Sequence, residues 1–328
     1  MMDARQRRFF IAGGAGFIGS FFVDRLLADG AIERVTVFDN FTSGRRWHLD
    51  PHAADPRLVV VQDDIKNLDA VVEAMAGHEV VIHLASNPDI AKAMTEPTVD
   101  FYEGTLLTHN VVEAMRINAV PMILYASGSG VYGDIGDTEA HEDMGPLVPV
   151  STYGASKLAG EALISSYCFM FGLRGRAFRF GNVVGPRQTH GVGFDFIRRL
   201  LDDPHHLRIL GDGTQSKSYV HVDDVVDAVL LAAGTVAEPF RAFNVATGDY
   251  ITVTEIADLA TEVAGLAPGA TQYEYAGGSR GWKGDVPVIR LDTSRIRALG
   301  WRNRLDSREA LLASMRAMLP LARSGALG

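Results

Sequence analysis

The sequence contains almost no cysteine: Cys168 is the only one among 328 residues. A single cysteine cannot form an intramolecular disulfide, and it cannot build a metal centre from several thiolates. Proteins without disulfides are typical of the reducing cytoplasm, which is the location we expect. The histidines and carboxylates show no spacing typical of a metal site, so we expect no metal ion.

Long apolar runs and an excess of basic residues are also missing. No stretch of about 20 apolar residues occurs, so the sequence predicts no membrane-spanning helix. The formal net charge is −9, whereas proteins that bind nucleic acid depend on clustered lysine and arginine. We therefore expect neither a membrane nor a nucleic acid as a partner, and we favour a small molecule.

Short apolar runs alternate with amphipathic segments through the first half of the chain. Buried strands that alternate with helices are typical of a doubly wound parallel sheet. We therefore predict an α/β protein of the Rossmann type. The expected strands are 9–12, 35–39, 58–62, 80–84 and 122–126, and the expected helices are 17–29, 68–76 and 105–117.

The second half is less regular, and several prolines interrupt it. No Gly/Ser linker precedes it, so its contact with the first half is expected to be continuous. We predict a Rossmann domain at 1–180 and a mainly substrate-binding lobe at 181–328, with some return of the chain to the first domain. The expected helices here are 194–201 and 223–233, and the expected strands are 207–210 and 242–245.

Glycines recur at every third position after the first predicted strand, as Gly13, Gly16 and Gly19. In a dinucleotide-binding turn the first glycine permits the tight bend and the second lets the backbone approach the pyrophosphate. The third allows the helix to pack closely on the strand. Phe17 and Ile18 open that helix, whose first amides are expected to face the phosphates.

Asp39 ends the second predicted strand, 20 residues after the last of these glycines. A carboxylate at this place can accept hydrogen bonds from the adenosine ribose, and it would repel a 2′-phosphate. The nearby Arg45 and Arg46 are more readily explained as part of a solvated loop. We therefore predict NAD rather than NADP as the cofactor.

Tyr153 and Lys157 stand four residues apart in a predicted helix, so their side chains project from one face. A neighbouring ammonium stabilises a phenolate, and we expect Lys157 to lower the pKa of Tyr153. The tyrosine would then be a general base towards a sugar hydroxyl. An isolated pair of this kind is common, but here it follows a dinucleotide fingerprint.

At this point the chain resembles the extended short-chain dehydrogenase/reductase family, especially enzymes similar to UDP-galactose 4-epimerase. The resemblance extends over nearly the whole chain. The motifs that carry it are GGAGFIG at 13–19, DNFTSG at 39–44, DDI at 63–65, HLAS at 83–86, VYGD at 131–134, YGASK at 153–157, GNVVGPR at 181–187 and GDGTQSKSYVHVDD at 211–224.

The resemblance implies roles for further residues. Asn40, Ser43 and Gly44 share the cofactor motif that begins with Asp39, and Lys157 also holds the nicotinamide ribose. The implied contacts with adenine are Asp64 and Ile65, and those with the phosphates and ribose are Leu84, Ala85 and Ser86. Asn182 is the implied contact with the substrate diphosphate, and Lys217 stands where the family usually places an arginine on that diphosphate. In SRGWKGDV at 279–286, Trp282 takes the place of a family arginine, and Arg280 is the candidate replacement.

One departure concerns the hydroxyl that relatives place four residues before the tyrosine of the VYG motif, because this position is Gly128 here. Ser127 and Ser129 flank it, and either could supply the hydroxyl. Alternatively, the tyrosine works without a serine partner. Nucleotide-sugar 4,6-dehydratases carry an Asp-Glu pair where this chain has Ser129 and Gly130, which disfavours the elimination of water.

The resemblance therefore implies an NAD-dependent nucleotide-sugar 4-epimerase that acts through a transient 4-keto sugar, with a UDP-sugar favoured. Two alternatives remain open: a dehydratase or an epimerase at another carbon on the same scaffold, and a non-catalytic NAD-binding regulatory protein. The family also implies a homodimer, formed by helices at 105–117 and 153–171 that pack across a two-fold axis.

Overall fold

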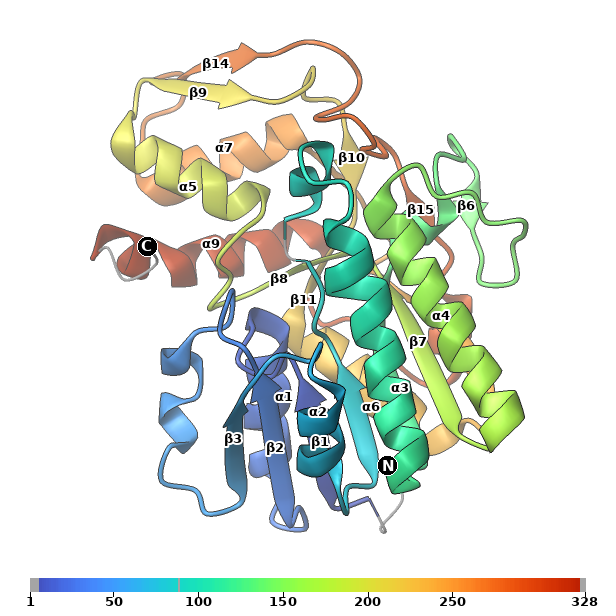
Figure 1. The fold of residues 1–328 in the computed structure, drawn as a ribbon. Helices are drawn as coiled ribbons and strands as arrows, with labels where there is room; N and C mark the ends of the chain where they lie inside the picture. Colours follow the sequence, from blue (N-terminus) through green and yellow to red (C-terminus); the bar gives the residue numbers. More distant parts are fainter. Residues whose placement is uncertain (1–5, 88, 325–328) are drawn as a thin grey trace.

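The computed structural model describes residues 6–87 and 89–324. Its centre is a seven-stranded sheet with the order β12-β7-β5-β4-β1-β2-β3, in which every neighbouring pair is parallel (Figure 1). The predicted doubly wound α/β fold is thereby confirmed. The strands are β1 (Arg8–Ala12), β2 (Arg34–Asp39), β3 (Leu58–Gln62), β4 (Val80–His83), β5 (Met122–Gly128), β7 (Arg174–Phe180) and β12 (Phe240–Val245).

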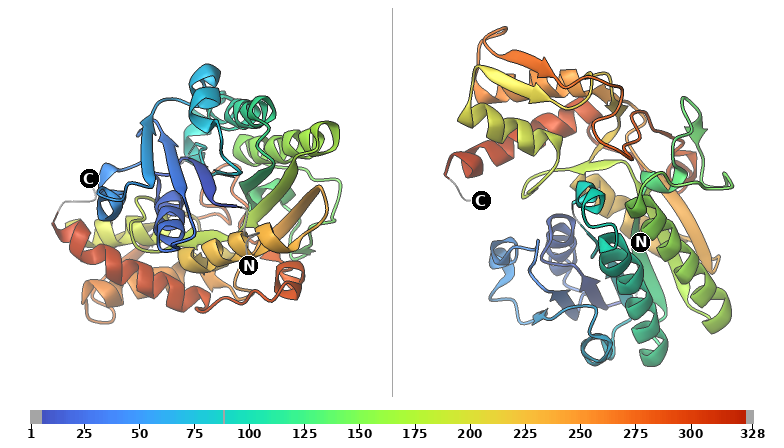
Figure 2. Two further views of the ribbon diagram at one scale, coloured as in Figure 1. Left: turned by 90° about the horizontal axis from the view of Figure 1, so that it is seen from below. Right: turned by 45° about the horizontal axis from the view of Figure 1, so that its top comes forward.

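Helices cover both faces of this sheet, and Figure 2 shows the strands between the two helical layers. Successive residues of a strand point to opposite faces: Phe9 and Ile11 of β1 pack in one core, while Phe10 and Ala12 pack in the other. The first core takes side chains from α1 (Phe17–Leu27) and α6 (Val222–Thr235), and the second takes them from α2 (Leu68–Met75), α3 (Leu106–Asn118) and α4 (Thr152–Phe171).

Strand β7 was missing from the sequence-based prediction because three arginines interrupt its apolar pattern. Arg176 is fully buried, and its guanidinium donates to the carbonyl oxygens of Gly175, at 2.7 Å, and Val236, at 2.6 Å. Arg179 is also buried and forms an ion pair with Glu161 at 2.7 Å. Hydrogen bonds to carbonyls and to a carboxylate thus compensate for burying these charges in the sheet.

The second half forms a smaller lobe over the carboxyl edge of the sheet, built on α5 (Val192–Asp202), α7 (Val253–Ala264) and α9 (Ser307–Arg323) (Figure 1). Strand β12 lies in this half of the sequence but pairs with β7 in the central sheet. The domain boundary near residue 180 stays a prediction. The lobe and the loops also contain β9 (His206–Ile209), β14 (Gln272–Tyr275), β8 (Asn182–Val184), β11 (Tyr219–His221), β10 (Ser216–Lys217), β13 (Ile251–Thr252), β6 (Glu139–Ala140), β15 (Arg290–Leu291) and α8 (Ser294–Ala298).

Short helical turns complete the described chain. A π-helical turn, Phe101–Thr105, leads directly into α3, and a 3-10 turn, Ser129–Tyr132, follows β5. The other 3-10 turns are Arg46–His48, Asp50–His52 and Ile90–Met94. Among the described residues, no helix has the length and apolar character needed to cross a membrane.

Candidate active site

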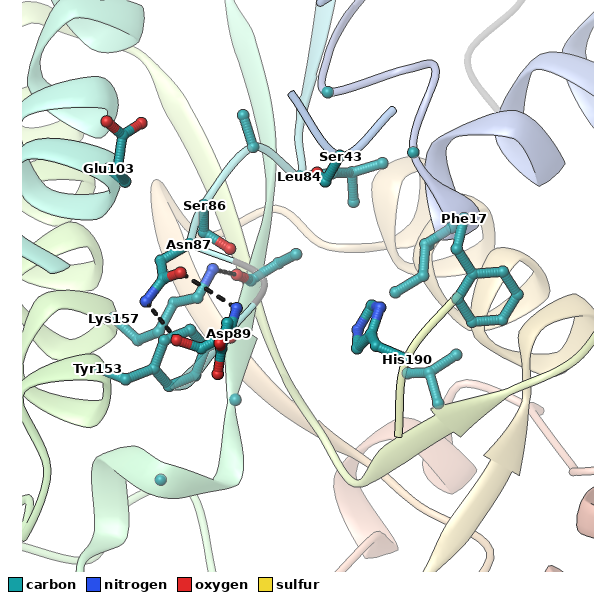
Figure 3. A pocket seen from close by; sticks show the side chains of 18 of the residues that line it. Phe17, Ser43, Leu84, Ser86, Asn87, Asp89, Glu103, Tyr153, Lys157 and His190 are labelled. Atoms are coloured by element: carbon teal, nitrogen blue, oxygen red, sulfur yellow. Dashed lines mark hydrogen bonds between the residues drawn. The ribbon is translucent and has the colours of Figure 1, made fainter. Parts of the chain in front are cut away.

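A cavity of about 970 Å³ lies at the carboxyl edge of the central sheet, between the sheet and the smaller lobe. Strands β1 and β4 are neighbours there, and their connections run to opposite sides, which is where open α/β sheets bind ligands. Figure 3 shows that the side chains around this cavity come from both halves of the chain. We therefore ask which of the predicted cofactor and catalytic residues line this cavity.

The glycine-rich loop forms one wall of the cavity. Gly13 has a φ of +83°, and a Cβ added to it would lie 2.8 Å from the backbone nitrogen of Ala85. At Gly19 an added Cβ would lie 2.4 Å from the carbonyl oxygen of Gly13. Side chains are thus excluded at both places, and the first amides of α1 have no partners within the helix. These amides and the backbone at Gly16 form a cradle that fits a pyrophosphate.

Asp39 lies at the end of β2 and lines the cavity while holding the glycine loop. Its carboxylate accepts hydrogen bonds from the amides of Ala15, at 2.9 Å, and Phe41, at 2.8 Å. Burial raises the pKa of Asp39, and the two amide hydrogen bonds oppose that rise. Hydroxyl donors from a ribose would stabilise the charged carboxylate further, so the site suits a ribose diol.

Most of the remaining cofactor residues predicted from sequence lie around the same cavity. Gly44 is an exception, since it packs against Asp39: an added Cβ would lie 2.7 Å from the Asp39 Oδ1 atom. The predicted cofactor residues that line the cavity are Gly13, Gly16, Phe17, Ile18, Gly19, Asp39, Asn40, Ser43, Asp64, Ile65, Leu84, Ala85, Ser86, Tyr153 and Lys157.

Arg45 and Arg46, which could have favoured a 2′-phosphate, do not line the cavity. Arg45 donates to the carbonyl oxygens of Ser43 and Gly44, at 3.3 and 3.4 Å. Arg46 donates to Gln62 and lies over the Phe41 ring. The cradle, the ribose-facing carboxylate and the position of these arginines together fit NAD as the cofactor.

Tyr153 and Lys157 lie in the first turns of α4, on the opposite side of the cavity from the glycine loop (Figure 3). The helix begins there because Ser151 caps it, accepting a hydrogen bond from the amide of Gly154 at 3.1 Å. The Lys157 Nζ atom donates to the carbonyl oxygen of Ala126 at 2.8 Å and lies 5.5 Å from the centre of the Tyr153 ring. The spacing in the sequence thus places both groups in one site.

The expectation that Lys157 lowers the pKa of Tyr153 is not met by this geometry. Burial raises the pKa of Tyr153 to about 12, a hydrogen bond with Ser86 lowers it in part, and Asp100 raises it. Burial also lowers the pKa of Lys157 to about 8, against the attraction of Asp100. Desolvation dominates because both groups are enclosed, which spacing along a helix does not reveal.

The two serines beside Gly128 have different hydrogen-bond surroundings. Ser127 is buried, and its hydroxyl donates to Glu161 at 2.5 Å, so it belongs to the ion pair between Glu161 and Arg179. Ser127 and Ser129 both line the cavity, Ser129 from the turn after β5. Ser86, which the resemblance suggests as a cofactor contact, lines the cavity on the loop after β4.

Three of the four predicted substrate residues, Asn182, Lys217 and Trp282, line the cavity on the side of the smaller lobe. The Lys217 Nζ atom pairs with the Asp285 carboxylate at 2.6 Å. Arg280 does not line the cavity: it donates to the carbonyl oxygen of Asp285 at 2.6 Å and to the carboxylate of Asp134 at 2.5 Å. Both contacts direct the guanidinium away from the cavity.

Sequence analysis missed Asp100, a carboxylate that is only 1% exposed. It accepts hydrogen bonds from Asn87 at 2.9 Å and from the Thr152 hydroxyl at 2.6 Å. Sequence analysis also gave no role to His190, which lines the cavity. Neither residue lies in a motif, and no local pattern could have identified them. Among the described residues, no group of three or more ligands is arranged to hold a metal ion.

The sequence is similar to a known protein family and to its characterised members. Residues 9–246 match the NAD dependent epimerase/dehydratase family. The chain is 34% identical over 311 residues to a UDP-glucose 4-epimerase of Mycolicibacterium smegmatis, an alignment that covers 93% of this chain and 96% of the relative.

Solved structures of epimerases and dehydratases have a similar fold. The fold is similar to a crystal structure of a UDP-galactose 4-epimerase, with a TM-score of 0.83 and 37% identity over 95% of this chain and 99% of that one. It is also similar to a dTDP-glucose 4,6-dehydratase from Streptomyces venezuelae with NAD bound, with a TM-score of 0.88 and 28% identity over 98% of this chain and 100% of that one.

Proposed function

Because the chain belongs to the NAD dependent epimerase/dehydratase family, within the extended short-chain dehydrogenase/reductases, we propose that it is an NAD-dependent nucleotide-sugar 4-epimerase. The reaction would pass through a transient 4-keto sugar and return to the opposite configuration at C4. The observation that carries this proposal is that Tyr153 and Lys157 share one cavity with the glycine-rich cradle and Asp39. An acid-base group and a hydride carrier therefore meet at the same substrate.

The side chains divide the chemistry between them. When bound, NAD supplies the acceptor and then the donor for the hydride at C4. The phenolate oxygen of Tyr153 accepts the proton of the 4-hydroxyl group, and the phenol returns it in the second half of the cycle. The Lys157 ammonium, held by the carbonyl of Ala126 and 5.5 Å from the centre of the Tyr153 ring, would offset part of the cost that burial imposes on this phenolate. Lys217 and Asn182 are proposed to hold the substrate diphosphate at the other end of the cavity.

A dehydratase is the second candidate, because one similar structure is a dTDP-glucose 4,6-dehydratase. Elimination of water needs an acid that protonates the departing hydroxyl. This chain has Ser129 and Gly130 where the dehydratases carry an Asp-Glu pair. We therefore favour an epimerase, and we favour a UDP-sugar because the relatives with the higher identity are UDP-sugar epimerases.

A homodimer is part of the proposal. Apolar side chains are exposed at the end of α4 and of α3: Phe169 and Met170 are both 72% exposed, and Ile117 is 49% exposed. Exposed apolar groups on adjacent helices favour association with a second copy. Sedimentation equilibrium would test this, and a monomer at all concentrations would contradict it. We also propose a cytoplasmic location, which rests on the single, buried Cys168.

The assignment is tested by incubating the NAD-loaded protein with UDP-, GDP-, ADP-, CDP- and dTDP-sugars and identifying the products by NMR. Inversion at C4 without loss of water is expected for one of them. Tyr153→Phe should abolish turnover while NAD binding, measured by calorimetry, is kept. A protein that binds NAD but converts none of these substrates would instead favour a regulatory role.

A further inference from the structure

We propose that Asp100, a buried carboxylate outside the pair Tyr153 and Lys157, is a positioning residue that holds Tyr153 towards the bound sugar. This inference rests on the proposed function, because it assigns a role within the same reaction. Asp100 does not line the cavity, and it transfers no proton and contacts no substrate in this role. It acts through the two segments of the chain that its carboxylate joins.

The Asp100 carboxylate binds one segment with each of its oxygen atoms. The Oδ1 atom accepts a hydrogen bond from the side-chain amide of Asn87 at 2.9 Å, and Oδ2 accepts one from the Thr152 hydroxyl at 2.6 Å. Asn87 lies on the loop after β4, and Thr152 is the first residue of α4, directly before Tyr153. Because Asp100 is only 1% exposed, water competes little for its oxygens, which strengthens both hydrogen bonds.

Asn87 and Asp100 stand at the two ends of a wall of the cavity. The Asn87 side chain also accepts a hydrogen bond from the amide of Asp89 at 3.0 Å and donates to the carbonyl oxygen of Asp89 at 2.8 Å. Figure 3 shows Asn87 and Asp89 beside Tyr153 and Lys157 on one side of the cavity. The Asp100 carboxylate therefore fixes this wall relative to α4. The residues that line the cavity between its two ends are Asp89, Lys92, Glu96, Thr98 and Val99.

Close packing joins the turn after Asp100 to the same part of α4. The π-helical turn Phe101–Thr105 begins directly after Asp100, and a Cβ added to Gly104 would lie 2.7 Å from the Ser156 Oγ atom. Ser156 in turn donates to the carbonyl oxygen of Tyr153 at 2.9 Å. The hydrogen bond to Thr152 and this packing together limit how far the first turn of α4 can shift relative to the cavity wall.

The chemistry of the link explains why a carboxylate stands at position 100. A carboxylate can accept hydrogen bonds with both of its oxygens, whereas the amide of an asparagine has one oxygen and would meet one of the two donors with its own NH₂ group. The proposed reaction is sensitive to this link, because the phenolate oxygen of Tyr153 must lie within hydrogen-bond reach of the sugar hydroxyl. A displacement of about 1 Å can lower the rate about 10²-fold.

Thr152 offers the most direct test of the link. It does not line the cavity, whereas Ser151 and Tyr153 on either side of it do. An effect of its hydroxyl on turnover must therefore pass through Asp100. Thr152→Val removes the hydroxyl and keeps the shape of the side chain, whereas Thr152→Ser keeps the hydroxyl and removes only a methyl group.

The experiment measures kcat and KM of the NAD-loaded variants Thr152→Val, Thr152→Ser, Asp100→Ala and Thr152→Val/Asp100→Ala, with UDP-glucose and UDP-galactose as probes. Asp100→Ala should lower kcat about 10²-fold and Thr152→Val about tenfold, because they break the link completely and in part. Thr152→Ser should keep the kcat of the unmodified protein. The double variant should be no slower than Asp100→Ala, because both substitutions act on the same link.

Further measurements separate positioning from folding and cofactor binding. The NAD dissociation constant and the KM of Thr152→Val should be nearly those of the unmodified protein, and kcat is expressed per folded protein, measured by circular dichroism. Asp224→Ala is the matched control: Asp224 is also 1% exposed, pairs with Arg304 at 2.8 Å and does not line the cavity, so its kcat should not change. If Asp100→Ala does not fold, the two Thr152 variants still decide the question.

The proposal is overturned if Thr152→Val keeps its kcat, if Thr152→Ser loses as much as Thr152→Val, if the losses follow NAD affinity or the folded fraction alone, or if the losses of the two single variants multiply in the double variant. These failures differ from failure of the proposed function. In that case the unmodified protein would convert neither nucleotide sugar, whereas here it remains active and only the role of Asp100 is wrong.

Discussion

Replacing Lys157 with methionine should remove activity. It should also remove the unfavourable free energy of keeping a charged ammonium buried in the folded protein. Lys157 is 3% exposed, and burial lowers its pKa from 10.5 to about 8. The unfolded chain therefore binds a proton between these two pH values, and the folded chain does not. The free energy of unfolding of the unmodified protein must then rise with pH in this window, whereas Lys157→Met lacks this contribution.

The size of this effect is set by the fall of the Lys157 pKa from 10.5 to about 8. A charged Lys157 costs the folded state roughly 3 kcal/mol at pH 7, and this cost falls to roughly 1 kcal/mol at pH 10. The variant also loses the hydrogen bond to the carbonyl of Ala126, and the difference between the ammonium and the amine as donors is already contained in the lowered pKa. The stability of the variant relative to the unmodified protein should thus decrease by roughly 2–3 kcal/mol between pH 7 and pH 10.

Urea unfolding followed by circular dichroism at pH 7 and pH 10 measures this difference. Comparison of the two proteins at each pH cancels the titration of groups that they share. A difference in stability that does not change with pH would mean that the Lys157 ammonium is not desolvated in the folded protein, contrary to this prediction. Turnover by the variant near neutral pH should fall at least 10²-fold.

Three further substitutions test other parts of the site. Gly13→Ala should weaken NAD binding strongly, because an added Cβ would lie 2.8 Å from the backbone nitrogen of Ala85; calorimetric titration with NAD measures this. Asp39→Asn should weaken NAD binding and reduce the preference for NAD over NADP, which comparing the two dissociation constants checks. Glu161→Ala should lower the free energy of unfolding by about 3–5 kcal/mol, because Arg179 would be left buried without its partner. Urea unfolding at pH 7 measures this loss, and a clearly smaller loss would contradict the prediction.

Much of the fold could be predicted because its signals are local. Apolar runs marked β1 to β5, and the spacing of apolar residues marked the helices between them. The signal failed at β7, where Arg176 and Arg179 lie in the sheet. Their partners, the carbonyl of Val236 and the carboxylate of Glu161, lie far away in the sequence, so no window around the strand could reveal them.

The same distinction between local and distant contacts applies to the site. Residues that act through a fixed spacing, such as the glycine loop, Asp39 and the pair Tyr153 and Lys157, were predictable from the chain alone. Contacts between distant segments were not. Asp100 joins the loop after β4 to the first turn of α4, and Arg280 pairs with Asp134, which lies 146 residues away in the sequence. The pKa of Tyr153 was misjudged for a related reason: burial depends on the whole fold, whereas the sequence argument considered one neighbour.

The fate of the hydrogen on C4 tests the central proposal most directly. UDP-glucose that carries deuterium at C4 would be incubated with the NAD-loaded protein, and the product would be analysed by proton and carbon NMR. UDP-galactose with deuterium retained at C4 is expected, because the hydride leaves and returns within one site. Deuterium released to solvent, inversion at another carbon or a product that has lost water would contradict it.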